Sequence, residues 1–262
     1  MAELAEKAER LRALHVPGDP LLLVNAWDAA SARTVAALPG CQAVATASWS
    51  IAAALGVPDG EAIGRDAMIA AVRTIAASVD LPVTADLERG YGDEPRDAAE
   101  TIAMAIDAGA VGANLEDSTG DPDRPLAAVA SQARKVRVAR GRAEAEGVPF
   151  VINARTDVFL LGLEFDEAVS RARAYLGAGA DVVFVPGVSD VDVLEQLVIK
   201  IRGPISVFGS AAGPTLDDLA RLGIPRVSYG PGPLGVAMAA LSRAAKGLLG
   251  GGEPPAELGN RP

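Results

Sequence analysis

Two acidic residues stand two positions apart at the end of an apolar run, in the stretch PVTADLERGYGDEP at positions 82–95. Side chains alternate along a β-strand, so Asp86 and Glu88 point to the same side of it. The next apolar run, GANLED, carries Glu116 at the same relative place. If the three carboxylates point inward from adjacent strands, they repel one another and raise each other's pKa. Oxygen ligands of this kind suit Mg²⁺ or Mn²⁺, so the sequence predicts a divalent-cation site.

Each single acid also has an ordinary interpretation as a solvated loop residue, because strand ends are polar in every barrel. A shared site is favoured because the pattern repeats on neighbouring runs and because Gly-Tyr-Gly at 90–92 predicts a tight loop that brings backbone close to a ligand. Arg155 ends the run FVINART. It is a carboxylate or phosphate clamp if it points inward and a surface ion-pair partner if it points outward.

Cysteine and histidine are scarce, which narrows the chemistry. The chain has one of each, Cys41 and His15. An internal disulfide is excluded, a zinc site built from Cys and His is not available, and a Cys–His pair requires these two distant residues to meet. The reaction must therefore use carboxylates, Arg, Lys, Tyr, Ser, backbone amides or a metal held by oxygen.

The charge balance bears on partners and location. The formal net charge is −10 and the pI is near 4.7, which opposes binding to nucleic acid or to an anionic membrane surface. No apolar run approaches the roughly 20 residues that span a bilayer. The N-terminus MAELAEKAERLRALH is a charged amphipathic pattern without a signal-peptide core. We expect an acidic cytoplasmic enzyme with no nucleic-acid or membrane partner.

Short apolar runs with strand-like composition alternate with alanine-rich helical patterns. The eight runs are 21–26, 43–48, 82–88, 112–117, 150–156, 182–187, 205–210 and 226–231. Repeated strand–helix units predict parallel strands with right-handed crossovers, and eight of them predict a closed (β/α)8 TIM barrel, an α/β fold. The 262 residues match one such domain, spanning 1–262. Chemistry in a barrel sits at the carboxyl ends of the strands, where the acids and Arg155 lie.

Five motifs in order resemble those of a known superfamily. They are NAWDAASA at 25–32, AAALGVPD at 52–59, DLERGYG at 86–92, GANLED at 112–117 and NARTD at 153–157. Together they resemble the isocitrate lyase and phosphoenolpyruvate mutase superfamily, over about residues 20 to 235. The resemblance implies a β/α barrel, a Mg²⁺ ion near the acids of the third and fourth strands, and substrates that are 2-oxo acids or their enolates.

The resemblance also implies roles for particular residues. Asp86, Glu88 and Glu116 match the metal acids, Arg155 the substrate clamp, and Asp59 a helper close to the metal. The substrate-binding candidates are Thr46, Ala47 and Ser48, which match a carboxylate-binding loop, together with Trp27, Asn153 and Arg155.

A homotetramer made of dimers, with the last helix exchanged between subunits, is a further implication. The segment 235–262 would then be a swapped helix and tail. A helix from about 235 to 249 with few charges fits this, because it carries the apolar residues Leu234, Val236, Met238, Leu241, Leu248 and Leu249.

The chain departs from the family pattern in the loop STGDPDRPL at 118–126. Lyases of the family carry a Lys-Lys-Cys-Gly-His signature here, and phosphonomutases a lysine and an asparagine. This loop instead has Asp121, Asp123 and Arg124. It is either an ordinary polar loop or a catalytic lid, in which Arg124 supplies a positive charge. Glu88 also stands where Asp is more usual, and Pro186 where lyases have a glutamate.

These features predict a Mg²⁺-dependent enzyme that acts on a 2-oxo acid through a metal-stabilised enolate, with carbon–carbon cleavage by a lyase or decarboxylase as the preferred reaction. Decarboxylation needs no protein acid for the leaving group. Retro-aldol cleavage needs a base, for which Tyr91, a loop aspartate or metal-bound water are candidates. The alternatives are carbon–phosphorus chemistry, of the phosphonomutase or phosphonopyruvate hydrolase type, and a protein that binds a 2-oxo acid without turnover.

Overall fold

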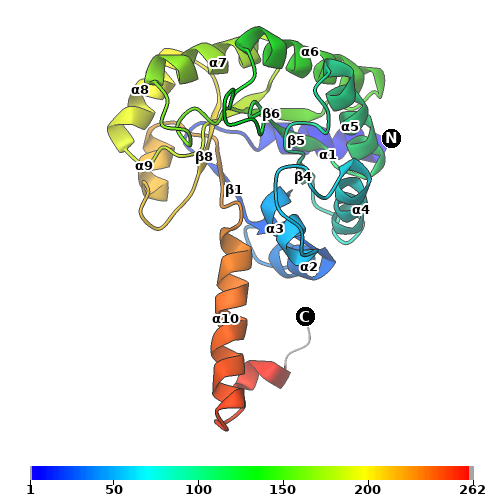
Figure 1. Ribbon diagram of the computed structural model, residues 1–262, viewed down its shortest axis with the longest axis vertical. Coiled ribbons are helices and arrows are strands. Elements are labelled where there is room, and N and C mark those ends of the chain that lie inside the picture. Colours follow the sequence, from blue (N-terminus) through cyan, green and yellow to red (C-terminus); the bar gives the residue numbers. More distant parts are fainter. Residues whose placement is uncertain (1, 260–262) are drawn as a thin grey trace.

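Short parallel strands in the computed structural model, which describes residues 2–259, form one sheet that curls into a barrel (Figure 1). The strands are β1 Leu21–Leu23, β2 Asn25–Ala26, β3 Val44–Thr46, β4 Val83–Asp86, β5 Gly112–Glu116, β6 Val151–Arg155, β7 Val182–Phe184, β8 Ile205–Phe208 and β9 Arg226–Ser228. The helices are α1 Ala2–Ala13, α2 Ala29–Ala36, α3 Ser48–Ala54, α4 Arg65–Ala76, α5 Pro95–Asp107, α6 Val129–Ala145, α7 Phe165–Gly177, α8 Val191–Ile201, α9 Leu216–Arg221 and α10 Gly232–Leu249.

The nine strands make eight strand positions, because β1 and β2 are one strand interrupted at Val24. The sheet order is β1-β9-β8-β7-β6-β5-β4-β3-β2, and every pairing is parallel. The sheet therefore closes where β1, paired with β9, continues into β2, paired with β3. Each of the eight predicted apolar runs contains a strand, which confirms the (β/α)8 TIM-barrel prediction.

Strand register arranges the polar residues in rows across the barrel. Asp86 of β4 pairs with Asn114 of β5, which pairs with Asn153 of β6. Glu116 pairs with Arg155 one pleat further toward the carboxyl end. Neighbouring Cα positions in a parallel pair carry side chains on the same face, so these rows gather the chemistry that the sequence distributes over three strands.

The core lies between the sheet and the helices that surround it (Figure 1). Helix α5, for example, buries Ala98, Ile102, Ala105 and Ile106, at the spacing of one helix face. At the amino end of the strands, α1 closes the barrel. A Cβ atom on Gly112 would lie 2.9 Å from Leu11 Cδ2 and 3.0 Å from the backbone oxygen of Val151, so glycine lets α1 pack closely on β5.

Helix α10 differs from the other long helices because it projects away from the barrel (Figure 1). It begins at Gly232, three residues before the predicted start. Its apolar side chains are largely exposed: Val236 is 72% exposed, Leu241 60% and Leu249 90%. A short 3-10 helix, Ala256–Gly259, follows it. Exposed apolar side chains in such a group usually mark an interaction site, so we expect another surface to pack against α10.

None of the helices in residues 2–259 has the length and apolar character needed to cross a bilayer. The location expected from the sequence stays a prediction.

The turn after β4 depends on a glycine in a left-handed conformation. Gly90 has a φ of +93°, and a Cβ atom there would lie 2.8 Å from the Ala98 Cβ on α5. Gly90→Ala should lower the free energy of unfolding by about 2–4 kcal/mol, because backbone strain and overpacking add. Gly147→Ala is the matched control: its φ is +71° and nothing lies within 4 Å of the added atom. The control should lose only about 1 kcal/mol in urea unfolding. Equal losses in the two variants would show that the contact with α5 does not constrain this turn.

Candidate active site

A cavity of about 340 Å³ opens at the carboxyl end of the barrel. Its polar lining comes from the ends of β2 to β6 and of β9 and from the loop after α3, and includes Asn25, Ser48, Asp59, Asp86, Asn114, Arg155 and Ser228. A larger and more open hollow of about 710 Å³ lies beside it, around Glu61, Arg65 and Tyr91. The smaller cavity is the candidate active site, because Asp86 and Arg155 line it and do not line the larger hollow.

Asp86 is held in place by donors from α3 and β5. Its Oδ2 accepts from the backbone N–H and from the hydroxyl of Ser48, each at 3.1 Å. The Nδ2 of Asn114 lies 3.5 Å from Oδ1, at the outer limit of a hydrogen bond. The backbone N–H of Asp86 donates to Thr46 Oγ1 at 2.8 Å. Thr46 and Ser48, both predicted to contact substrate, therefore also position the carboxylate, and Ala47 between them lines the cavity.

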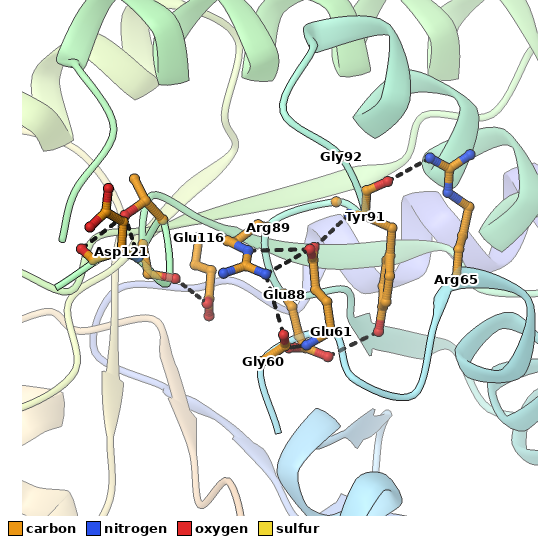
Figure 2. A network of polar contacts seen from close by, with 12 residues as sticks. Gly60, Glu61, Arg65, Glu88, Arg89, Tyr91, Gly92, Glu116 and Asp121 are labelled. Atoms are coloured by element: carbon orange, nitrogen blue, oxygen red, sulfur yellow. Dashed lines mark hydrogen bonds and ion pairs between the residues drawn. The ribbon is translucent and has the colours of Figure 1, made fainter. Parts of the chain in front are cut away.

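Glu88 is buried against the loop at 60–61 and Tyr91 (Figure 2). Its Oε2 accepts from the backbone N–H of Glu61, and its Oε1 accepts from the Tyr91 hydroxyl at 3.0 Å. Burial and the nearby charge of Asp59 raise the pKa of Glu88 to about 7. Burial and the charge of Glu88 raise the pKa of the Tyr91 hydroxyl well above its usual range. A phenol that donates to a carboxylate and resists ionisation is a poor base, so its position does not favour the base role considered for Tyr91.

Glu61 completes this network and was missed by the sequence-based prediction. Its Oε1 accepts from the Tyr91 backbone N–H at 2.6 Å, and its Oε2 pairs with Arg89 at 2.9 Å (Figure 2). Glu61, Glu88 and Tyr91 all have positive φ, at 68°, 50° and 59°. The only signal in the sequence was the glycine before Glu61.

Arg155 points inward, lines the cavity and lies between two carboxylates. Its Nη1 is 2.9 Å from Glu116 Oε2, and its Nε and Nη2 donate to Asp157 at 2.5 and 3.0 Å. The guanidinium lies 5.9 Å from the ring centre of Phe184. Burial raises the pKa of Glu116, and the charge of Arg155 opposes that rise. Of the two alternatives for Arg155, the structure shows the inward one.

A buried ion pair anchors the ends of β5 and β6. Asp117 is fully buried and accepts from Arg171 Nη1 at 3.0 Å and from the Tyr175 hydroxyl at 2.7 Å. Its other oxygen accepts from the backbone N–H of Asp157 at 3.1 Å. Every charge in this group has a hydrogen-bonded partner, which is the condition under which a buried charge is tolerated. Helix α7 thereby fixes the segment that carries Asp157.

A second arginine lies beneath the cavity, inside the barrel. Arg226 is 1% exposed, and burial lowers its pKa to about 10. Its Nη2 lies 3.4 Å from Asn114 Oδ1 and from Thr84 Oγ1, while its Nε and Nη1 have no partner within residues 2–259. His15 lies close enough for the charge of Arg226 to act on it. Burial and that charge lower the pKa of His15 to about 4.

Seven predicted site residues lie outside the cavity lining: Trp27, Thr46, Glu88, Tyr91, Glu116, Arg124 and Asn153. Asn153 lies two strands away from Asp86 and donates to Asn114 Oδ1 at 2.8 Å. Trp27 packs partly buried against the core, and its backbone N–H donates to Ser31. The Arg124 side chain is 85% exposed and pairs with Asp121 at 3.3 Å. The catalytic role of Arg124 therefore stays a prediction that requires the loop 118–126 to move.

The donor set fits a hydrated divalent cation. No group of three or more His, Cys, Asp or Glu side chains within residues 2–259 is arranged as a ready-made metal site. Partial desolvation and the charge of Asp86 raise the pKa of Asp59, and the pKa values of Glu88 and Glu116 are raised as well. The carboxylates therefore repel one another, and negative charge is in excess around the cavity. Mg²⁺ keeps several waters and takes only one or two carboxylates directly, so one direct carboxylate with others reached through water is compatible with this geometry.

The comparisons with known proteins agree with the fold. The family model described as phosphoenolpyruvate phosphomutase matches residues 11–249. The 2-methylisocitrate lyase of Escherichia coli is 32% identical over 253 residues, covering 89% of this chain and 83% of the lyase. A Burkholderia cenocepacia crystal structure, provisionally described as a phosphonomutase, is 44% identical with a TM-score of 0.88, covering 93% of this chain and 98% of that chain.

A crystal structure of 2,3-dimethylmalate lyase, described as a member of the PEP mutase/isocitrate lyase superfamily, is 25% identical with a TM-score of 0.85. The aligned region covers 99% of this chain and 92% of that chain. The motifs, the barrel and these matches agree, and the chain belongs to the phosphoenolpyruvate phosphomutase family of the PEP mutase/isocitrate lyase superfamily.

Proposed function

We propose that this protein is a Mg²⁺-dependent enzyme that breaks a carbon–carbon bond in a 2-oxo acid, as a lyase or decarboxylase. The observation that carries the proposal is the cavity at the carboxyl end of the barrel, where Asp86, Asp59 and Arg155 converge. Bound Mg²⁺ would draw electrons from the oxo and carboxylate oxygens of a 2-oxo acid and so favour loss of a group from the adjacent carbon.

The residues divide into those that hold charge and those that bind the substrate. Asp86 is the direct metal ligand in this proposal, because it lines the cavity and two hydrogen bonds from Ser48 hold its carboxylate in place. Glu88 and Glu116 act through water. Arg155 binds the substrate carboxylate, for which it must share its donors with Glu116 and Asp157. Asp59 is the candidate proton acceptor, since it lines the cavity, where partial desolvation and the charge of Asp86 raise its pKa.

The names of relatives support carbon–carbon chemistry. 2-methylisocitrate lyase and 2,3-dimethylmalate lyase are named for reactions of that class. The loop 118–126 has neither Cys nor His, so a leaving group that needs protonation from that loop is not expected. Decarboxylation requires no such acid, which makes it the simplest reaction for this set of residues.

Carbon–phosphorus chemistry is the second candidate, because the matching family model is that of phosphoenolpyruvate phosphomutase. A phosphoryl group in transit needs cationic partners. Arg155 is the only cationic side chain in the described lining of the cavity, and Arg124 would have to join it from the loop.

We also propose that the protein is a homotetramer made of dimers, with α10 packed on a neighbouring subunit. Support comes from the exposed apolar side chains of α10 and its projection from the barrel (Figure 1).

Turnover of 2-oxo acids in the presence of Mg²⁺ tests the reaction. A panel of 2-oxo acids should give a product that depends on Mg²⁺, and Asp86→Asn should reduce kcat/KM by at least about a hundredfold, since a preorganised charge is lost. The melting temperature should stay unchanged. Asp80→Asn, on the exposed loop before β4, should retain full activity. Full activity of Asp86→Asn, or activity in excess chelator, would contradict the proposed site.

The same incubations separate the alternatives. Phosphorus NMR of a reaction with phosphonopyruvate detects carbon–phosphorus chemistry directly. Mg²⁺-dependent binding of 2-oxo acids without any product would support a binding protein instead of an enzyme.

Mg²⁺ affinity should depend on pH through Glu88, whose pKa is raised to about 7. Below pH 7 the metal-free protein holds a proton on this carboxyl group, and a cation must displace it. The affinity measured by calorimetry should therefore rise by about tenfold from pH 6 to pH 8. In Glu88→Gln this rise should be smaller. Affinity that does not change between pH 6 and pH 8 would show that Glu88 does not face the cation.

Sedimentation velocity tests the assembly. The wild-type protein should sediment as a tetramer at micromolar concentration, and Leu241→Glu on α10 should dissociate it, because a charge would replace buried apolar contacts. Ile199→Glu on α8, at a side chain of similar exposure, is the control and should leave the assembly intact. A monomeric wild-type protein would overturn the proposal.

A further inference from the structure

The active-site cavity has two chemically different halves. The ends of β2 to β6 supply the acids, the amides and Arg155. The opposite half is built from the ends of β7, β8 and β9 and the segment after β6. It is lined by Leu160, Phe184, Pro186, Phe208 and Pro231, with the hydroxyl of Ser228 as the polar side chain among them. The described lining of this second half contains no charged side chain.

The positive charges near the cavity are few and already occupied. Arg155 is the one cation in the described lining, and two carboxylates share it. Arg226 lies under the floor and does not line the cavity, and Arg124 pairs with Asp121 outside it. A second carboxylate on the substrate would face the two phenylalanine rings without a cationic partner in the described lining, and such burial is strongly unfavourable.

The apolar half is held in a fixed shape by two glycines with positive φ. A Cβ atom on Gly230 would lie 2.6 Å from Phe208 Cε2, so only glycine lets the ring occupy its place. A Cβ atom on Gly187 would lie 3.0 Å from the backbone nitrogen of Leu160. These two close contacts shape the apolar wall.

We infer that the apolar half selects a 2-oxo acid with a single carboxylate and an uncharged hydrocarbon substituent on the carbon next to the oxo group. This inference rests on the proposed function and names its substrate class. The oxo and carboxylate groups belong beside Asp86 and Arg155, so the remainder of the molecule must enter the opposite half. The cavity of about 340 Å³ has room for more than a three-carbon acid.

Binding of a homologous series tests the inference. With Mg²⁺ present, calorimetry of pyruvate, 2-oxobutanoate, 2-oxopentanoate and 2-oxohexanoate should show the Kd falling about fourfold per added methylene, the factor for burying one such group. Where an acid is consumed, kcat/KM should follow the same gradient. 2-Oxoglutarate should bind at least about tenfold more weakly than 2-oxopentanoate, its five-carbon monoanionic counterpart.

Two variants of Phe208 test whether this side chain buries the hydrocarbon part of the substrate. Phe208→Ala should reduce the gradient to less than about twofold per methylene, because the wall that buries the chain is gone. Phe208→Arg should reverse the preference in favour of 2-oxoglutarate. Leu38→Ala, at an exposed apolar residue outside the cavity, is the control and should keep the wild-type gradient. Mg²⁺ binding and the melting temperature report whether each variant is folded.

The outcomes separate this inference from the proposed reaction. A clear gradient without turnover of any acid would support the inference and overturn the proposed reaction. Turnover with a flat gradient, or tighter binding of 2-oxoglutarate than of 2-oxopentanoate, would overturn the inference alone. Tighter binding of the dianion that is lost in Arg124→Ala would show that the loop 118–126 supplies a second cationic site.

Discussion

An excess of negative charge at the carboxyl end of the barrel is the constraint on which the rest of the site depends. Asp86, Asp59, Glu88 and Glu116 lie close enough to act on one another's ionisation, and burial raises the pKa of the last three. Arg155 offsets part of this charge from one side, and Arg226 contributes from below. A divalent cation would neutralise the remaining negative charge. Hydrogen bonds to the carboxylates from nearby donors stabilise their charged form in the meantime.

The fold meets this constraint through register and anchoring. Parallel pairing sets Asp86 beside Asn114 and Glu116 beside Arg155, so each acid has a polar neighbour on the next strand. The ion pair of Asp117 with Arg171 fixes the segment behind Arg155 from the helix side. The polar half of the cavity is thus held by hydrogen bonds, whereas the apolar half is shaped by the close packing of Phe208 against Gly230 and of Leu160 against Gly187. Different interactions therefore shape the polar and the apolar half of the cavity.

The sequence predicted the parts of this structure that depend on local periodicity. Apolar runs of strand length and amphipathic helical segments determine the eight strand–helix units, and polar residues at the ends of the runs mark the carboxyl face. Asp86 and Arg155 were found in this way. The interruption of the first strand at Val24 was not, since nothing in the run 21–26 signals a break in pairing.

Other features depend on tertiary contacts that no local pattern reports. Glu61 enters the site because an unusual backbone conformation turns its carboxylate toward Tyr91. Arg226 reads as the first residue of an ordinary strand, although its side chain fills the barrel interior. Arg124 is a candidate lid residue by its place in the sequence, and in the structure its exposed side chain pairs with Asp121, three positions before it. Sequence patterns locate strand ends well, and they do not determine which charges finally face one another.

Anomalous scattering from crystals soaked in Mn²⁺ tests the central claim most directly, because it locates the cation without reference to activity. The account predicts one peak per chain, in the cavity at the carboxyl end of the barrel and next to the Asp86 carboxylate, and no peak there in Asp86→Asn crystals. A peak at another place, or an empty cavity at millimolar Mn²⁺, would contradict the claim that the clustered carboxylates form a cation site.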